Sequence, residues 1–269
     1  MSMPDKIHVT RWGHTGPSVV LVHGSAQGSK IGGDGHFAAQ EALAADGWQL
    51  MVPDRPGHGA SPALGRPDDA EADGAWVADL LGFGAHLVGH SFGGCVALAA
   101  AARRPDAVRS LTLIEPGMQK LATDIPEVRR FVLKLVTTMI FSFSPERRAG
   151  RFAKLVGIPS GIRGGTDRAE LKAMGLGIAK LKVPTAATLR AELETIKAAG
   201  VPLLVVTGGW SAAFDAVGRR VAEVGGGRHE IVASTNHFPN LMPAFNPLLA
   251  AFMEQADAHA QTRAGSSIA

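Results

Sequence analysis

The chain of 269 residues contains no tyrosine and a single cysteine, Cys95. One cysteine can form no disulfide within the chain and cannot build an all-cysteine zinc site. Charged residues make up only 19% of the chain and hydrophobic residues 46%, a balance that excludes a disordered protein. The 27 basic residues nearly offset the 24 acidic ones, so the net charge of +3 indicates no nucleic-acid partner.

Long apolar runs are also missing. Because no stretch of about eighteen apolar residues is present, we expect no membrane span and no membrane partner. The first ten residues include Asp5 and His8 and lack the apolar centre of a signal peptide. We therefore expect a soluble cytoplasmic protein that acts on a small molecule. The oligomeric state, including a homo-oligomer, stays open.

Short apolar runs that end in glycine, proline or polar residues alternate with helical patterns. Strands that are buried on both faces have this unbroken apolar character, so the alternation predicts a parallel sheet wrapped by helices. A further strand at 7–12 is expected at an antiparallel edge. The predicted core strands are 18–23, 48–53, 85–89, 110–114, 201–206 and 228–233, and the helices between and after them are 37–46, 69–81, 94–104 and 245–259.

The segment 118–197 interrupts this alternation, because it contains no strong strand pattern. Apolar residues recur there on one helical face, at 128, 131, 132, 135, 136 and 139. We predict one core domain made of residues 1–117 and 198–269, with residues 118–197 inserted into it as a helical cap.

A G-x-S-x-G pattern at residues 89–93 places Ser91 between Gly89 and Gly93. It follows an apolar strand and precedes a helix of small residues, which is the context of a nucleophile on a tight strand-to-helix turn. Such a serine has strained backbone geometry, and glycines beside it avoid collisions. At the helix start, the amide of Phe92 points toward a developing oxyanion. The pattern predicts a nucleophile at Ser91 and an oxyanion-binding amide at Phe92.

With these motifs the chain resembles the α/β-hydrolase fold superfamily over about residues 17–115 and 200–255. The other matching features are His23-Gly24 after the first core strand, the Asp-Arg-Pro-Gly-His-Gly run at 54–59, and Asn236-His237 near the end. The resemblance implies an α/β fold with a mostly parallel central sheet flanked by helices and a helical cap insertion. It also implies a second oxyanion-hole amide, which maps onto Ser25, with Ala26 as the neighbouring alternative.

The resemblance assigns the general base to His237, because this residue follows the last strand. Imidazole titrates near neutral pH and can therefore take the proton of a serine hydroxyl. We interpret His23 and His58 as residues that pack the loops. We interpret His36 and His86 as surface or loop residues, and the glycine-rich run at 32–36 as a flexible loop near the pocket.

Two carboxylates compete for the acid that orients His237. Glu115 comes directly after the strand 110–114. Relatives commonly carry an aspartate at the position that Ser211 occupies here, and Asp215 lies four residues after it. A buried carboxylate at a strand end is costly without a partner, and a histidine would supply one. An acid placed directly after this strand also resembles the arrangement in the zearalenone-type lactonases. We favour Glu115 and keep Asp215 as the alternative.

A substrate pocket is expected beside these residues, although each of its members could equally serve only to pack the protein. The chain has no G-x-G-x-x-G fingerprint, so we expect no nicotinamide or flavin cofactor. We expect no bound metal. The predicted pocket residues are Ala26, Phe131, Leu135, Met139, Trp210 and Phe238.

These expectations lead to a serine hydrolase that cleaves a small or medium apolar carboxylic ester or lactone through an acyl-enzyme on Ser91. Thioester hydrolysis, hydrolysis of a carbon–carbon bond and cofactor-free lyase chemistry use the same fold and stay open. A ligand-binding protein that kept the fold without turnover is the alternative outside the enzymes. The substrate itself is not specified by the sequence.

Overall fold

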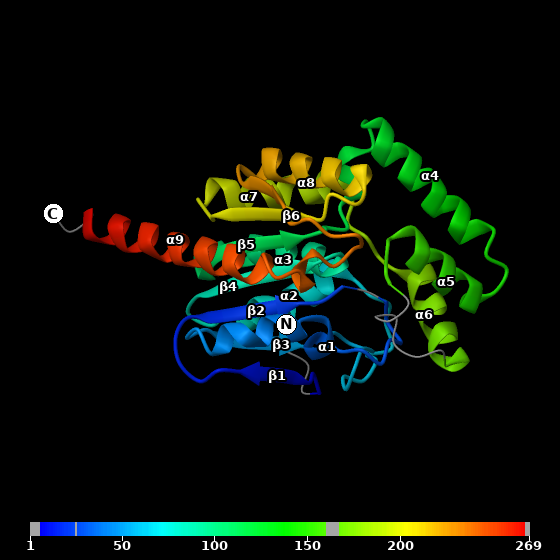
Figure 1. The fold of residues 1–269 in the computed structure, drawn as a ribbon, viewed down its shortest axis with the longest axis horizontal. Helices are drawn as coiled ribbons and strands as arrows, with labels where there is room; N and C mark the ends of the chain where they lie inside the picture. The colour runs from blue at the N-terminus through cyan, green and yellow to red at the C-terminus, as the bar shows by residue number, and fades with distance from the viewer. Residues whose placement is uncertain (1–5, 25, 160–166, 267–269) are drawn as a thin grey trace.

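The computed structural model describes residues 6–24, 26–159 and 167–266. Within them the chain forms a seven-stranded sheet in the order β1-β3-β2-β4-β5-β6-β7 (Figure 1). β1 (Val9–Trp12) pairs antiparallel with β3 (Gln49–Pro53) at one edge, and the other strand pairs of this sheet are parallel. The predicted parallel sheet with an antiparallel edge strand is confirmed. The remaining strands are β2 (Ser18–Val22), β4 (Ala85–His90), β5 (Val108–Ile114), β6 (Leu203–Thr207) and β7 (Arg228–Ile231).

Helices cover both faces of the sheet, because its inner strands are apolar on both sides. Val20 and Val22 of β2 face one helical layer, whereas Val19 and Leu21 face the other, as the alternation of side chains along a strand requires. None of the helices in the described ranges is long and apolar enough to cross a membrane. The first layer holds α2 (Ala70–Leu80), α3 (Phe92–Arg103), α7 (Ala186–Ala198) and α8 (Ala212–Gly225), and the second holds the 3-10 helix η1 (Ala38–Ala44) and α9 (Phe245–Ser266).

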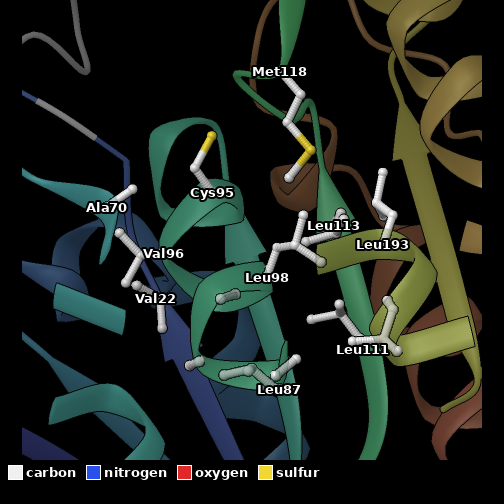
Figure 2. Packing of buried hydrophobic residues seen from close by; sticks show 14 of the residues in the cluster. Val22, Ala70, Leu87, Cys95, Val96, Leu98, Leu111, Leu113, Met118 and Leu193 are labelled. Atoms are coloured by element: carbon white, nitrogen blue, oxygen red, sulfur yellow. The ribbon is translucent and has the colours of Figure 1, made fainter. Parts of the chain in front are cut away.

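The small side chains of α3 let this helix lie close to its neighbours. A Cβ atom added to Gly74 of α2 would come within 2.7 Å of the Cβ of Ala99, so the two helices approach more closely than larger residues would allow. Figure 2 shows the apolar side chains of α3 interleaved with those of β4, β5 and α7. Cys95 is fully buried in this layer, and its burial raises the pKa of the thiol to about 12, which suits packing and not reactivity.

Between β5 and β6, the described residues form the 3-10 helix η3 (Gln119–Ala122) and then four α-helices. Three of them, α4 (Pro126–Ile140), α5 (Pro145–Leu155) and α6 (Arg168–Lys180), lie together at one end of the molecule, beyond the carboxyl ends of the strands (Figure 1). The fourth, α7, packs with α3 and α8 on the sheet, where its Leu189, Leu193 and Ile196 are fully buried. We call α4, α5 and α6 the inserted helices.

Candidate active site

Ser91 stands at the sharp turn between β4 and α3. Its φ of 57° lies in the left-handed region, which only one other non-glycine residue of the described ranges adopts. Both flanking glycines are required by close packing. A Cβ on Gly89 would lie 2.5 Å from the carbonyl oxygen of Gly93, and a Cβ on Gly93 would lie 2.2 Å from that of Val22. The strain at Ser91 is therefore maintained by neighbours that admit no larger residue.

Helix α3 begins at Phe92, directly after this turn. The Ser91 side chain makes no capping hydrogen bond, so it does not occupy the first amides of the helix, that of Phe92 included. The loop after β2 also approaches closely, because a Cβ on Gly24 would lie 3.0 Å from the Cβ of Ser91. Ser25, the predicted second oxyanion-hole residue, lies outside the described residues, and Ala26 beside it is buried.

The structure brings Glu115 to His237. The Nδ1 atom of His237 lies 3.2 Å from Oε2 of Glu115, and the side chains are 2% and 0% exposed. The other carboxylate oxygen accepts a hydrogen bond of 2.6 Å from the backbone N–H of Gly208. The alternative acid, Asp215, instead accepts from the N–H of Gly209 at 3.3 Å, in the first turn of α8. Of the two predicted acids, Glu115 is the one in contact with the imidazole.

Burial pushes the members of this pair toward their uncharged forms. It lowers the pKa of the His237 imidazole and raises the pKa of the Glu115 carboxyl, because either charge would have to leave water. The Gly208 N–H opposes the shift at Glu115, since it stabilises the carboxylate. The Nε2 atom of His237 is buried and has no hydrogen-bond partner among the described residues. A neutral imidazole with an unoccupied Nε2 is the form that can accept a proton.

Five histidines follow one another around this edge of the sheet. The rings of His58, His23, His36, His90 and His237 lie in that order, with neighbouring centroids 4.8 to 5.6 Å apart. His36 Nε2 lies 3.2 Å from His90 Nδ1, and His90 Nε2 donates to the carbonyl oxygen of His237 at 2.8 Å. Interpreting His36 as a surface or loop residue was therefore wrong. No three of the histidine, cysteine and acidic side chains in the described ranges are arranged to hold a metal ion.

His36 reaches the site because two consecutive glycines, Gly32 and Gly33, stand at the start of the short helix α1 (Gly33–His36). A Cβ on Gly32 would lie 2.2 Å from Oδ1 of Asp54, and a Cβ on Gly33 would lie 2.8 Å from the carbonyl oxygen of Pro53. The N–H of Gly33 donates to the Asp54 carboxylate at 2.6 Å. The glycine pair thus lets the chain lie directly against the end of β3, and this was the one sequence signal for the position of His36.

A cavity of about 40 Å³ lies between the loop after β2 and the inserted helices. Two of the six predicted pocket residues, Ala26 and Phe238, line it together with Ala153 of α5 and Met174 of α6. This volume is well below the roughly 300–1,000 Å³ of a typical ligand pocket, so the space beside the histidines is narrow.

The other four predicted pocket residues pack nearby. Phe131 and Trp210 contact Phe214, whose ring centroid lies 4.8 Å from that of His237. Met139 packs against the apolar cluster that contains Ala26. Leu135 is half-buried on α4 and is not among the residues that line the cavity. Phe131, Trp210 and Met139 therefore belong to the apolar surroundings of His237 or of the cavity, whereas the prediction of Leu135 as a pocket residue is not supported.

The turn, the buried pair and the sheet order point to one family. Residues 17–155 match the family model described as the alpha/beta hydrolase fold. The chain belongs to the α/β hydrolase family. Its strand order, with a single antiparallel strand at one edge, and the site at the carboxyl ends of the strands are consistent with that membership.

Relatives of this α/β hydrolase include esterases and a lipase. The chain is 36% identical over 149 residues to lipase LipV of Mycobacterium tuberculosis, across 53% of each protein. It is 44% identical over 103 residues to the pimeloyl-[acyl-carrier protein] methyl ester esterase of Chromobacterium violaceum, across 37% of each. The chain thus spans about half the length of the one and about a third of the other. A solved hydrolase of Oleispira antarctica, olei00960, shares the fold, with a TM-score of 0.70 at 20% identity and coverage of 93% of this chain and 95% of that one.

The inserted helices also hold the loop that carries His237. Just after α5, the carbonyl oxygen of Gly157 accepts a hydrogen bond of 3.1 Å from the backbone N–H of His237. Gly157 has a φ of +72°, and a Cβ there would lie 2.7 Å from the indole ring of Trp210. This glycine therefore lets the end of α5 approach the histidine loop and Trp210 at once.

Replacing Gly157 with alanine is expected to lower kcat of the hydrolase about tenfold, because the strained backbone and the contact with Trp210 displace the histidine loop. The matched control is Gly150→Ala in α5, since a Cβ at Gly150 meets no atom within 4 Å. The control is expected to keep its activity and to gain about 0.5–1 kcal/mol of stability from better helix propensity. Equal activity of the two variants would show that Gly157 does not position His237.

Proposed function

We propose that this α/β hydrolase cleaves a small or medium apolar carboxylic ester or lactone through an acyl-enzyme on Ser91. The hydrogen bond between His237 and Glu115 carries the proposal, because it orients a buried imidazole at the same sheet edge as a strained serine. The relatives that act as lipase and methyl ester esterase support an ester as the substrate. The enzyme needs no metal or organic cofactor in this reaction, and we propose that it works in the cytoplasm.

The first half of the reaction forms the acyl-enzyme. The active form has Glu115 ionised, so activity is expected to rise as the pH passes the raised pKa of this carboxyl. Nδ1–H of His237 then donates to the Glu115 carboxylate, which leaves the lone pair of Nε2 as the base. Nε2 takes the proton of the Ser91 hydroxyl while the Ser91 oxygen attacks the substrate carbonyl carbon. The negative charge then collects on the former carbonyl oxygen. The amide of Phe92 at the start of α3 binds this oxygen, and the amide of Ser25 is proposed as its second donor.

The second half returns the enzyme to its resting state. The His237 imidazolium, stabilised by Glu115, gives its proton to the leaving alcohol as the ester bond breaks. A water molecule enters, gives a proton to Nε2 and attacks the acyl carbon. The bond between the acyl carbon and the Ser91 oxygen then breaks, Nε2 returns the proton to that oxygen, and the carboxylic acid leaves. Since burial disfavours the imidazolium, the charge on Glu115 is what makes this step accessible.

Helices α4, α5 and α6 are proposed as the cap of the active site, a narrower cap than the segment 118–197. Ala153 and Met174 bring α5 and α6 against the cavity, and Gly157 fixes the histidine loop. Because this cavity is only about 40 Å³, the cap side chains are proposed to move apart when an ester enters. The apolar surroundings favour an apolar acyl group over a charged one.

Labelling with a fluorophosphonate tests the proposal. We expect one covalent adduct, mapped by peptide mass spectrometry to Ser91, and a loss of hydrolysis of short chromogenic esters in step with labelling. Ser91→Ala is expected to take up no label. An adduct at another serine, or full esterase activity in Ser91→Ala, contradicts the proposal. A labelled enzyme that cleaves only thioesters or carbon–carbon bonds would keep the nucleophile but replace the substrate class.

A further inference from the structure

Helix α4 and the turn after it expose a row of large apolar side chains. Leu133 is 63% exposed, Val136 45% and Ile140 64%, and they are followed by Phe141 at 56% and Phe143 at 86%. The first three recur at i, i+3 and i+7, so they form one stripe along the helix. We call these five residues the α4 stripe. The opposite side of α4 packs against α5 and α8, so the stripe is a second apolar surface that the helix does not need for its own packing.

Positive charge is concentrated in the same part of the chain. Residues 126–180, which span the inserted helices, contain 11 of the 27 basic residues and 4 of the 24 acidic residues, which gives this segment a net charge of +7. The rest of the chain then has a net charge of −4, although the whole protein carries only +3. The nearly neutral composition therefore conceals a strongly basic end of the molecule.

Basic side chains lie directly beside the α4 stripe. On α4 itself, Arg129 and Lys134 are exposed. On α5, Arg147, Arg151 and Lys154 are exposed at spacings of four and three residues, which places them on one face. Arg151 donates a hydrogen bond of 2.9 Å from Nη1 to the carbonyl oxygen of residue 141, so the basic face of α5 adjoins the end of the stripe.

We propose that the α4 stripe and the basic side chains around it dock the protein on an anionic lipid surface. Exposed aliphatic and phenylalanine side chains on a helix, flanked by lysine and arginine, match the way amphipathic segments lie in the boundary between headgroups and acyl chains. The basic residues add attraction to anionic headgroups. The expectation of no membrane partner came from the lack of a membrane span, and docking of this kind requires none.

Charge and position favour a lipid surface over two other partners that could cover the α4 stripe, a second copy of the chain and an acidic protein. A two-fold interface with a second copy would bring the basic faces of two α5 helices together, which like charges oppose. An acidic protein would satisfy the charges, but it would need a matching groove for a ridge of five large apolar side chains. A fluid lipid boundary accepts such a ridge without a preformed shape. Figure 1 shows α4 at the outer margin of the molecule, away from the sheet, where it can reach a surface.

Flotation of the purified protein with vesicles tests the inference and does not depend on the proposed catalytic activity. We expect binding to phosphatidylcholine vesicles that contain phosphatidylglycerol, and little binding to phosphatidylcholine alone. The triple variant L133S/I140S/F143S is expected to bind at least tenfold more weakly. F83S is the matched control, because Phe83 is fully exposed but lies before β4, at the amino ends of the strands. This control is expected to bind like the wild type.

The contribution of charge is tested by a second pair of variants. R129Q/R147Q is expected to bind anionic vesicles about tenfold more weakly, and high salt is expected to weaken wild-type binding in the same direction. R11Q/R219Q removes the same number of exposed charges from the rest of the chain and is expected to have little effect. Thermal melting of each variant confirms that the fold is retained.

Three results would overturn the inference. The first is the absence of wild-type binding to anionic vesicles, and the second is equal binding by the triple variant and F83S. The third is loss of self-association in the triple variant, or of binding to a purified acidic acyl carrier protein, without any change in vesicle binding. That third result would assign the α4 stripe to a protein interface.

Discussion

Replacing Glu115 with glutamine is expected to lower kcat about 10⁴-fold at a pH above 8, where the wild-type carboxyl is ionised, and to leave the protein folded. Glutamine has the shape of glutamate, and its amide oxygen can still accept the hydrogen bond from Gly208. Its NH₂ group then faces Nδ1 of His237, which must become an acceptor. The imidazole proton moves to Nε2, so the nitrogen that should take the serine proton is no longer a base.

The matched control for this variant is Asp215→Asn. Asparagine can keep the hydrogen bond from Gly209, and Asp215 makes no contact with the imidazole among the interactions of the described residues. We therefore expect kcat to change less than about threefold. Measuring kcat for the two variants with one chromogenic ester separates the two acids. A large loss in Asp215→Asn together with an active Glu115→Gln would show that the acid is Asp215.

Glu115→Gln is also expected to change the pH dependence of stability. Burial raises the pKa of the Glu115 carboxyl from 4.5 to about 8, so the folded state holds this proton more tightly than the unfolded state does. The stability that the protonated carboxyl provides is complete below pH 4.5 and is lost as the pH rises through 8. Glu115→Gln cannot ionise. Its melting temperature, relative to wild type, should therefore rise between pH 5 and pH 8.5, and a constant difference would contradict the raised pKa.

The central sheet and the nucleophile turn were predictable because local patterns specify them. Buried parallel strands are continuous apolar runs, and the collisions that require Gly89 and Gly93 involve atoms close in sequence or in the adjacent strand. Glu115 was predictable for a related reason. A carboxylate at the end of a buried strand requires a partner, and the resemblance supplied His237 as a candidate.

Contacts between residues far apart in the chain were not predictable in the same way. His86 was interpreted as a surface or loop residue, but it is fully buried, with Nδ1 2.8 Å from the Ser110 hydroxyl and Nε2 3.3 Å from Asp257. Asp257 lies 171 positions later, on α9, so no local sequence pattern predicts its contact with His86. The position of α7 on the sheet was missed because its apolar face has the same spacing whether it covers a cap or a core.

Arg55 is the other residue whose replacement is expected to have a large effect. Its side chain is fully buried, with an ion pair from Nη2 to Asp68 and one of 3.2 Å from Nε to Asp73. Nη1 donates to the carbonyl oxygen of Gly24 at 2.8 Å, and the guanidinium lies 4.8 Å from the centroid of the Phe92 ring. Arg55 therefore links the loop after β2 to Phe92, the residue that follows the proposed nucleophile Ser91.

Arg55→Met is expected to destabilise the protein by about 3–5 kcal/mol, because the buried Asp68 and Asp73 carboxylates lose the cation that lies between them. Chemical denaturation measures this loss. Arg66→Met is the control: Arg66 also pairs with Asp73, but its side chain is 28% exposed, so its removal should cost about 1 kcal/mol or less. Equal losses in the two variants would contradict the proposed central position of Arg55.

Arg55→Lys separates positioning from stability. Lysine keeps the positive charge between Asp68 and Asp73, but it lacks the planar fork that reaches both carboxylates and Gly24 together. Asp68 in turn accepts from the N–H of Gln27 at 3.0 Å, so Arg55 holds the described residues on both sides of positions 25 and 26. We expect kcat/KM at a temperature well below the Tm to fall at least tenfold, since the proposed oxyanion-hole loop loses its support. A variant with lowered Tm and unchanged kcat/KM would show that Arg55 stabilises the fold without positioning that loop.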